Sequence, residues 1–258
     1  MAQQAETFTP PLNLEEKLKK YLLPSQLYIH LRWKKERRKV PELRLLPFLC
    51  SPEKASLDVG ANKGVYSYAM LGHSKEVHSF EPHPKMHDLM VSYLGDRIKP
   101  YKTALSNQTG TAQFHLRKTK GGYSNMGGSL KEREGQAGRE DTEAFAFDVE
   151  TKRLDDCDIG DIGFMKIDVE GFEMEILEGA KETLRKYRPN LLIEVENAHD
   201  KGVSVGARVG EICMTYGYRC YALRRGQLTP FSQLDPQKHF TKGQRSKDYI
   251  FNFIFLPE

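Results

Sequence analysis

Short apolar runs alternate with segments of helical spacing along most of this chain. Strands are expected at 55–59, 77–80, 98–104, 144–149, 164–170, 191–196, 218–222 and 249–256. Helices are expected after Gly64 and at 85–94, 172–187 and 205–216, where apolar residues recur at helical spacing. This alternation predicts an α/β protein whose sheet is mainly parallel, with right-handed crossovers.

The first strand runs into a glycine turn, Gly60-Ala61-Asn62-Lys63-Gly64. Glycine lets the backbone turn sharply and approach a ligand without a Cβ. Because ligands of open α/β sheets bind beyond the carboxyl ends of the strands, Gly60, Ala61, Asn62 and Gly64 are candidate cofactor-binding residues. A glycine turn of this kind also occurs in α/β proteins of other function.

The second strand delivers Glu81 to the same edge and stops at Pro82, which has no N–H for a sheet ladder. Glu81 is placed to accept hydrogen bonds from both hydroxyls of a ribose, and Pro82 joins the candidate cofactor site. Asn62 stands where a dinucleotide fold usually has the glycine that lets pyrophosphate approach. The pattern therefore favours S-adenosylmethionine, which has no phosphate, and Asp58 could face its ammonium group directly or through water.

Two later strands end in carboxylates, Asp168 with Glu170 and Glu194 with Glu196. Methyl transfer to an alcohol needs a general base or a metal. We expect Asp168 to be the base or to orient the acceptor, with Glu170 and Glu194 as further catalytic residues. His199 could relay a proton or be a surface residue, and the paired acids could instead cap helices. A divalent metal stays open, and no metal ligands are predicted.

Composition agrees with a cytoplasmic enzyme. The 258 residues, 39% hydrophobic and 29% charged, suit one α/β domain with modest extensions. The four cysteines show no C-x-x-C spacing, so we expect neither a disulfide framework nor a zinc site. No apolar stretch approaches the roughly 20 residues that span a bilayer, and the start lacks a signal-peptide core.

Positive charge gathers in the first 50 residues, where ten Lys or Arg stand against five Glu. This segment contributes +5 to the net charge of +4, and the remainder sums to −1. We interpret residues 1–53 as a basic helical extension. It could be a solvated helix face, or it could contact the inner face of an anionic membrane through residues 17–44. Nucleic-acid binding is less favoured because no binding motif accompanies the basic run 32–39.

The order of the motifs resembles the FkbM family of S-adenosylmethionine-dependent methyltransferases. The matching segments are 58–64, 80–82, 104–106, 127–130, 166–173 and 191–196. The resemblance covers roughly residues 54–256 and marks 54–258 as the methyltransferase domain. It implies a class I methyltransferase fold, with a Rossmann-like sheet of seven strands, mostly parallel with one antiparallel strand near the C-terminus.

The resemblance also implies O-methylation, commonly of sugar or polyketide hydroxyls. It implies that Asp58, Gly60, Asn62 and Gly64 line the cofactor, that Glu81 holds the ribose, and that Asp168 faces the reacting groups. Two segments depart from the family pattern: a stretched glycine loop at 121–128, within the longer glycine-rich loop 121–141, and a basic insertion at 223–247. Variable loops usually contact the substrate, so the acceptor is not predicted beyond its class.

Two functions compete. The first is O-methylation of a sugar, glycan or glycolipid precursor, or of a secondary metabolite. The alternative is a nucleic-acid or protein methyltransferase that holds its target with the basic N-terminus. The Asn-Pro-Pro-aromatic motif that often marks base methylation is replaced by Asp168-Val169-Glu170-Gly171, which disfavours the alternative.

Overall fold

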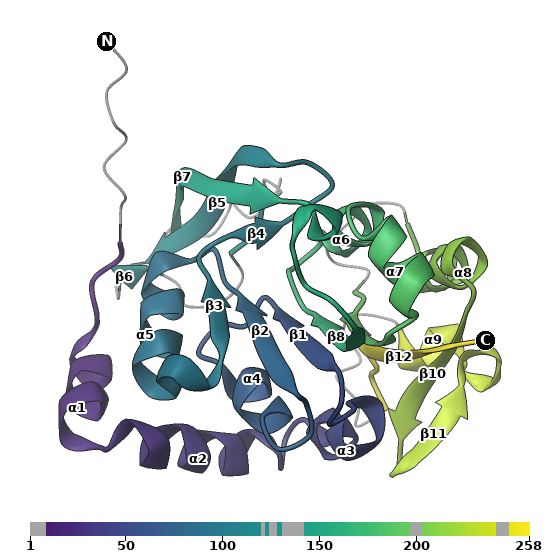
Figure 1. Cartoon of the computed structure of the whole chain (residues 1–258), viewed down its shortest axis with the longest axis horizontal. Coiled ribbons are helices and arrows are strands. Elements are labelled where there is room, and N and C mark those ends of the chain that lie inside the picture. Colours follow the sequence, from purple (N-terminus) through teal and green to yellow (C-terminus); the bar gives the residue numbers. More distant parts are fainter. Residues whose placement is uncertain (1–8, 120–121, 124–127, 131–141, 197–202, 241–247) are drawn as a thin grey trace.

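The computed structural model describes residues 9–119, 122–123, 128–130, 142–196, 203–240 and 248–258. Within them an eight-stranded central sheet has the order β11-β10-β12-β9-β8-β1-β2-β3 (Figure 1). Its strands are β1 (Ala55–Val59), β2 (Glu76–Phe80), β3 (Lys99–Tyr101), β8 (Ile162–Ile167), β9 (Asn190–Glu194), β10 (Tyr218–Arg224), β11 (Gln227–Pro230) and β12 (Asn252–Pro257). Strands β1, β2, β3, β8 and β9 pair in parallel, whereas β12 is antiparallel to β9 and β10.

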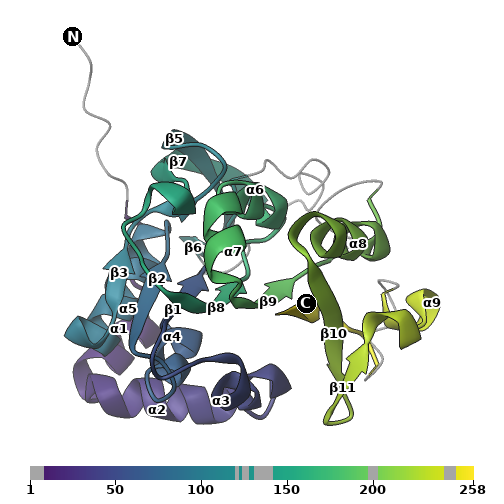
Figure 2. The same cartoon turned by 45° about the vertical axis from the view of Figure 1, so that its right-hand side comes forward.

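The expected fold class, a mostly parallel α/β sheet of Rossmann-like order, is confirmed. The sheet has one antiparallel strand more than expected, because β11 pairs antiparallel with β10. It comes from the insertion at 223–247, part of which forms a hairpin at the edge of the sheet (Figure 2). Arg225 and Gly226 at the turn both have positive φ, 49° and 81°, as a two-residue hairpin turn requires. A short helix, α9 (Pro236–His239), follows in the same insertion.

Helices cover both faces of the central sheet. On one face lie α2 (Ser25–Glu36), α3 (Leu46–Leu49), α4 (Val65–Met70) and α5 (Pro84–Leu94), and on the other α6 (Glu173–Glu178), α7 (Lys181–Tyr187) and α8 (Val205–Tyr216). Neighbouring residues of one strand therefore enter different cores: Leu191 and Ile193 pack with α6–α8, and Leu192 packs with the α2–α5 layer. This double burial explains why the strands are continuous apolar runs.

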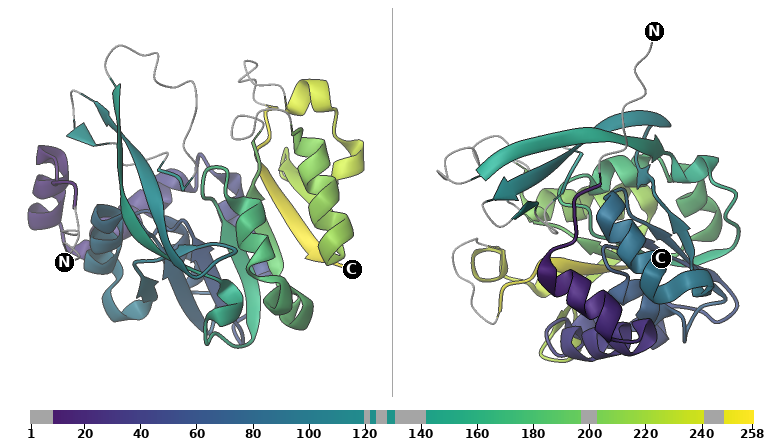
Figure 3. Two further views of the ribbon diagram at one scale, coloured as in Figure 1. Left: turned by 90° about the horizontal axis from the view of Figure 1, so that it is seen from above. Right: turned by 90° about the vertical axis from the view of Figure 1, so that its left-hand side faces the viewer.

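A second, smaller sheet lies beside the carboxyl edge of the first (Figure 3). Its order is β4-β7-β5-β6, with β4 (Ala104–Leu105), β5 (Gly110–Thr119), β6 (Gly122–Tyr123) and β7 (Thr142–Lys152). The sequence interpretation missed β5 and its long antiparallel ladder with β7.

The prediction of one strand at 98–104 was wrong. It divides into β3 of the central sheet and β4 of the small sheet. The hydroxyl of Thr103 donates to Glu150 Oε2 at 2.9 Å, and Ser106 N donates to Lys152 O, so the chain turns away to join β7.

The helix expected at 172–187 is also two helices, α6 and α7, with a break at Gly179–Ala180. Asp155 accepts hydrogen bonds from the backbone N–H groups of Glu182 and Thr183 and so caps the start of α7. Gly179 lies against the backbone of the small sheet, since a Cβ there would stand 2.0 Å from Ser106 O. The final strand begins at Asn252, three residues later than expected, whereas β1 and α8 have the expected bounds.

The N-terminal extension packs on the domain. Helix α2 lies along α4 and α5, with His30 Nδ1 3.0 Å from the Tyr68 hydroxyl, and helix α1 (Leu14–Leu22) lies beside α5 (Figure 1). Large apolar side chains remain exposed on these two helices: Leu14, Leu18, Tyr21, Leu22, Leu27 and Leu31. Contact of residues 17–44 with an anionic membrane stays a prediction, which co-sedimentation with anionic vesicles would test. Every helix in the described ranges is too short or too polar to cross a membrane.

Parts of two predicted loops lie outside the described residues, namely 120–121, 124–127 and 131–141 of the glycine-rich loop and 241–247 of the insertion. The candidate proton relay His199 also lies outside them.

Gly60 is a position where the fold does not accommodate a side chain. Its φ is +79°, and a Cβ there would stand 2.0 Å from Asp168 O, a backbone atom of the neighbouring strand end. We expect Gly60→Ala to lower the free energy of unfolding by about 2 kcal/mol or more, from left-handed backbone strain and this overlap. Gly72→Ala is the matched control, because nothing lies within 4 Å of the position that its Cβ would occupy. Equal urea midpoints for the two variants would contradict the expected strain and overlap at Gly60.

Candidate active site

The glycine turn joins β1 to α4 in a strained but fully bonded conformation. Gly60 and Ala61 both donate to Phe80 O at 3.0 Å, and Gly64 donates to Ala61 O at 2.8 Å. Gly60, Asn62 and Gly64 all have positive φ, between 49° and 79°. A Cβ on Gly64 would also stand 2.7 Å from Leu94 Cδ1 of α5. Both glycines are therefore required by backbone conformation and by close packing.

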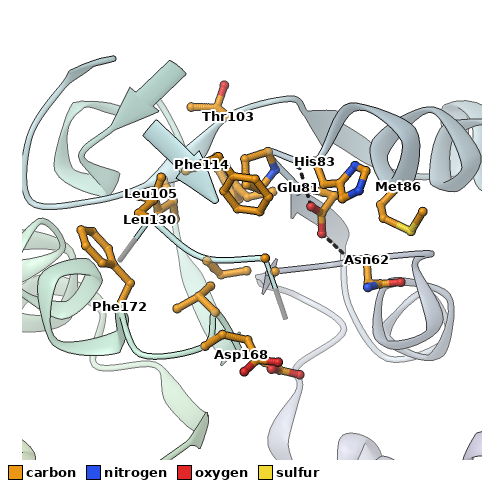
Figure 4. Close-up of a pocket in the computed structure, with 18 residues that line it drawn as sticks. Asn62, Glu81, His83, Met86, Thr103, Leu105, Phe114, Leu130, Asp168 and Phe172 are labelled. Atoms are coloured by element: carbon orange, nitrogen blue, oxygen red, sulfur yellow. Dashed lines mark hydrogen bonds between the residues drawn. The ribbon is translucent and has the colours of Figure 1, made fainter. Parts of the chain in front are cut away.

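Glu81, at the end of β2, holds the two neighbouring loops together. Its Oε2 accepts the backbone N–H of Asn62 at 2.7 Å, and its Oε1 accepts that of His83 at 2.8 Å (Figure 4). The side chain is buried, which raises the pKa of Glu81 to about 7 although these two backbone hydrogen bonds lower it. A carboxylate has about four acceptor sites, so Glu81 retains capacity for further donors such as hydroxyl groups.

A cavity opens beside Glu81 at the carboxyl edge of the sheet. Its lining comes from the ends of β1, β2 and β8, from α5, and from the small sheet. The lining side chains include His83, Met86, Thr103, Leu105, Phe114, Leu130 and Phe172 (Figure 4). Glu81 and Asp168 lie on different sides of this cavity, with apolar groups between them. The arrangement suits a ligand that has polar ends and a flat apolar part.

A buried lysine connects the start of the glycine turn to the acidic strand ends. Lys166 lies opposite Asp58 in the β1–β8 ladder, and its Nζ is 3.6 Å from Asp58 Oδ1 and 3.0 Å from Asp168 Oδ2. The same ammonium lies 4.8 Å from the centre of the Tyr66 ring. Burial lowers the pKa of Lys166, but attraction to Asp168 and Asp58 outweighs it and raises the pKa overall. The two carboxylates therefore favour the charged form of Lys166.

Asp58 serves the fold beneath the cavity. Its Oδ2 accepts the N–H of Ser67 at 2.8 Å and the Ser67 hydroxyl at 2.6 Å. These bonds fix the first turn of α4, whose start is the glycine turn. Asp58 is fully buried and does not line the cavity.

Glu194, at the end of β9, is hydrogen-bonded to Asp168. Burial, followed by the negative charges of Asp168 and Glu170, raises the pKa of Glu194 far above that of a free carboxyl. The raised pKa favours the protonated form of Glu194, which can donate a hydrogen bond to Asp168, while Lys166 Nζ lies 3.0 Å from Asp168 Oδ2. The Asp168 side chain remains 35% exposed, which leaves it accessible to an acceptor.

The loop after β8 is held in an unusual conformation. Glu170 has a positive φ of 61°, rare for a residue with a side chain, and Gly171 follows at 101°. The Ser129 hydroxyl donates to Glu170 O at 3.1 Å, and Ser129 also pairs with His115 of β5. The small sheet therefore supports the loop that carries the acidic residues.

The N-terminal extension reaches the glycine turn. Glu16 of α1 is buried and forms ion pairs with Lys63 at 2.9 Å and with Lys85 at 3.1 Å. Burial raises the pKa of Glu16, but hydrogen bonds from Lys63, the Asn13 backbone and Lys85 lower it to about 2.

The structure brings most of the predicted site residues to one edge. Those that line the cavity are Gly60, Asn62, Glu81, Pro82, Asp168 and Glu170. Ala61 and Gly64 support the turn from below, and Glu194 reaches the site through Asp168. Asp58 lies outside the lining and contacts Ser67 and Lys166, so its role of facing a ligand's ammonium group, directly or through water, stays a prediction.

Sequence reasoning missed Lys166 and the apolar wall. Lys166 stands two positions before Asp168 on a strand, so both side chains share a face, which was a readable signal. Phe114 comes from the unrecognised β5, and nothing local in the sequence places it near Glu81. Among the described residues, no group of three or more His, Cys, Asp or Glu is arranged to hold a metal ion.

A family model for the methyltransferase FkbM domain matches residues 58–220, more than half of the chain. The chain belongs to the FkbM methyltransferase family. The match begins at Asp58 and includes the glycine turn, Glu81 and all the acidic strand ends.

Two individual proteins illustrate how far the similarity extends. The chain is 27% identical over 157 residues to the 2-O-methyltransferase NoeI of Sinorhizobium fredii (strain NBRC 101917 / NGR234). That alignment covers 56% of this chain and 65% of the relative, less than two thirds of its length. The crystal structure of an FkbM methyltransferase from Methylobacillus flagellatus KT superposes with a TM-score of 0.50 at 15% identity, covering 80% of this chain and 44% of that one. This second likeness concerns the fold alone.

The buried Lys166 should be essential for stability of this FkbM methyltransferase domain. We expect Lys166→Met to lower the free energy of unfolding by about 3–5 kcal/mol, because it leaves two carboxylates without their cation. Lys181→Met removes an exposed pair with Glu178 and should leave the urea midpoint unchanged. If Lys166→Met unfolds at the wild-type midpoint, the cation does not hold β1 and β8 together.

Proposed function

We propose that the protein is an S-adenosylmethionine-dependent O-methyltransferase that acts on a hydroxyl of a sugar, glycan or glycolipid precursor. The observation that carries this proposal is the common edge shared by the buried Glu81 carboxylate and the Asp168–Glu194–Lys166 cluster. The Glu81 carboxylate suits the hydroxyls of a ribose, and the Asp168–Glu194–Lys166 cluster suits the hydroxyl of a methyl acceptor. The 2-O-methyltransferase relative supports oxygen as the methylated atom.

The cavity fits the parts of S-adenosylmethionine. Glu81 offers acceptor positions for ribose hydroxyls, and the neighbouring apolar wall, with Leu105 and Phe114, suits an adenine ring. When bound, S-adenosylmethionine supplies a methyl group activated by a positive sulfonium. The turn from Gly60 to Gly64 brings backbone, without side chains at its two glycines, close to the ligand.

Asp168 is the residue that takes the acceptor proton in this proposal. The hydroxyl proton becomes strongly acidic as the oxygen forms its new bond to carbon. A carboxylate, although a weak base, is therefore sufficient if it is close and aligned. Lys166 and Glu194 both donate to Asp168 and thereby fix its orientation. The remaining exposed part of the carboxylate is free to meet the hydroxyl.

The competing function, methylation of nucleic acid or protein held by the basic N-terminus, receives less support. Lys63, within the cofactor turn, and Lys85 of α5 are already paired with Glu16 of the N-terminal extension. The exposed surface of α1 and α2 carries apolar side chains among its charges.

Cofactor binding should depend on the ionisation of Glu81. With a pKa of about 7 the side chain is about one-tenth ionised at pH 6 and nine-tenths at pH 8. If the carboxylate accepts ribose hydroxyls, the Kd for S-adenosylmethionine measured by calorimetry should fall about tenfold over this range. Glu81→Gln should bind S-adenosylmethionine more weakly and show no such pH dependence. This comparison distinguishes titration of Glu81 from titration of the ligand. A wild-type Kd that varies no more than that of Glu81→Gln would remove Glu81 from the proposed site.

The role of Asp168 can be separated from cofactor binding. We expect Asp168→Asn to keep the Kd for S-adenosylmethionine within about threefold while methyl transfer falls by about 10²–10⁴. Transfer of labelled methyl from S-adenosylmethionine to a panel of oligosaccharides and sugar nucleotides measures this. Asp156→Asn, an exposed acid away from the cavity, is the control. Full activity in Asp168→Asn would refute the proposed base.

A further inference from the structure

A second cavity lies at the same edge of the central sheet, on the α2 side. Three segments line it: Lys39–Glu42 after α2, Leu223–Arg225 at the β10–β11 turn, and Asp248–Asn252 before and at the start of β12. Both β9 and β10 are antiparallel to β12, so they point the same way. The carboxyl end of β10 and the start of β12 thus lie at the edge that carries Asp168 and Glu194.

Two residues of this second cavity contact the acidic strand end of β9. Asn252 is the ladder partner of Glu194, and the Tyr249 hydroxyl donates to Glu196 Oε1 at 3.3 Å. Tyr66 lies close to acids of both regions. Burial raises the pKa of its hydroxyl, and two groups of negative charge raise it further: Glu42 from the wall of the second cavity, and Asp168 and Glu194 from the acidic cluster. The cluster therefore lies between the cofactor cavity and the second cavity.

The second cavity has an excess of positive charge. Lys39, Arg224 and Arg225 line it, and of these only Arg225 has an ion pair within the described ranges, at 3.9 Å from Asp248. Asp248 also lies 3.8 Å from Lys238. Arg224 Nε is buried and has no hydrogen-bond partner in the described part of the chain.

The acidic side chains of the wall do not cancel this charge. Glu42 is the other acid that lines the cavity. Burial raises the pKa of Glu42, which favours its neutral form, while its own backbone N–H opposes the shift. In the lining itself, three cations therefore stand against Asp248 and the buried Glu42, and the further acids Glu194 and Glu196 lie at the side of the cavity that faces the acidic cluster.

Two aromatic rings accompany the cations. The ring centres of Tyr249 and Phe251 are 5.9 Å apart, and Phe251 is 37% exposed. Aromatic rings offer flat apolar surfaces, which suit the C–H face of a sugar ring. Cations beside aromatic surfaces are a combination that fits a charged carbohydrate.

We propose that this second cavity is the acceptor subsite for an anionic glycan, with Tyr249 and Phe251 holding a sugar ring and Arg224, Arg225 and Lys39 holding a phosphate or carboxylate group. The proposal rests on the proposed O-methyltransferase function and specifies its substrate class. It gives the basic hairpin a role in selecting the acceptor.

The strand order sets how far the charged group lies from the methylated hydroxyl. β10 is two strands from β9 and three from β8. At about 4.8 Å between strands, Arg224 lies roughly 10–15 Å from the acidic cluster across the sheet. The anionic group therefore belongs to a different unit of the acceptor from the sugar that receives the methyl group.

The test measures anion binding independently of methyl transfer. The probes are inorganic pyrophosphate and a trigalacturonate, which separate a phosphate-type from a carboxylate-type ligand, titrated at constant ionic strength against ¹⁵N-labelled protein. We expect at least one probe to shift the Arg224 Nε–H signal, and Arg224→Gln to weaken that probe about tenfold or more. Arg219→Gln is the matched control, since Arg219 lies on the same strand but pairs with Glu258.

A second pair of variants guards against misfolding of Arg224→Gln. Lys39 is exposed, so Lys39→Gln should fold and weaken the same probe several-fold, whereas Arg38→Gln, next to it but outside the lining, should not. Binding of neither probe, or equal binding by Lys39→Gln and wild type, overturns the subsite. S-adenosylmethionine binding is measured on every variant. If the wild type does not bind S-adenosylmethionine, the proposed function is wrong. If it binds S-adenosylmethionine but neither probe, only the subsite is wrong.

Discussion

One buried ammonium group organises both halves of the site. Lys166 lies between Asp58 and Asp168, and each carboxylate fixes a different part of the molecule. Asp58 holds the first turn of α4 through Ser67, and Asp168 holds Glu194. Removing the charges of Lys166 and Asp58 from water is costly, and it is tolerated here because their mutual attraction, the neighbouring Asp168 and hydrogen bonds compensate. The positions of the glycine turn and of the acidic strand ends are therefore set by a common electrostatic unit.

Local signals explain what the sequence could predict. The parallel strands are buried on both faces, so they appear as apolar runs with clear limits, and the glycine turn marks a backbone conformation that other residues avoid. Glu81 and Asp168 were recognisable because they end such strands. These signals were sufficient for the fold class and for one edge of the site.

Non-local contacts explain what was missed. β5 is a mostly polar strand whose apolar residues Phe114 and Leu116 face one side only, and its partner β7 begins more than 20 residues later. The role of Lys166 depends on register between β1 and β8, which are separated by about a hundred residues. The hairpin that adds β11 was hidden in a basic insertion, where charge obscured the strand pattern.

The two hydrogen bonds that Glu81 already makes have a thermodynamic consequence. Because backbone amides of Asn62 and His83 hold the carboxylate in one rotamer, a ligand does not have to immobilise it. Ordering a flexible side chain at a binding site usually costs about 0.5–1.5 kcal/mol of conformational entropy. In this protein that cost is met during folding, so the loops after β1 and β2 present a preorganised surface to whatever ligand arrives.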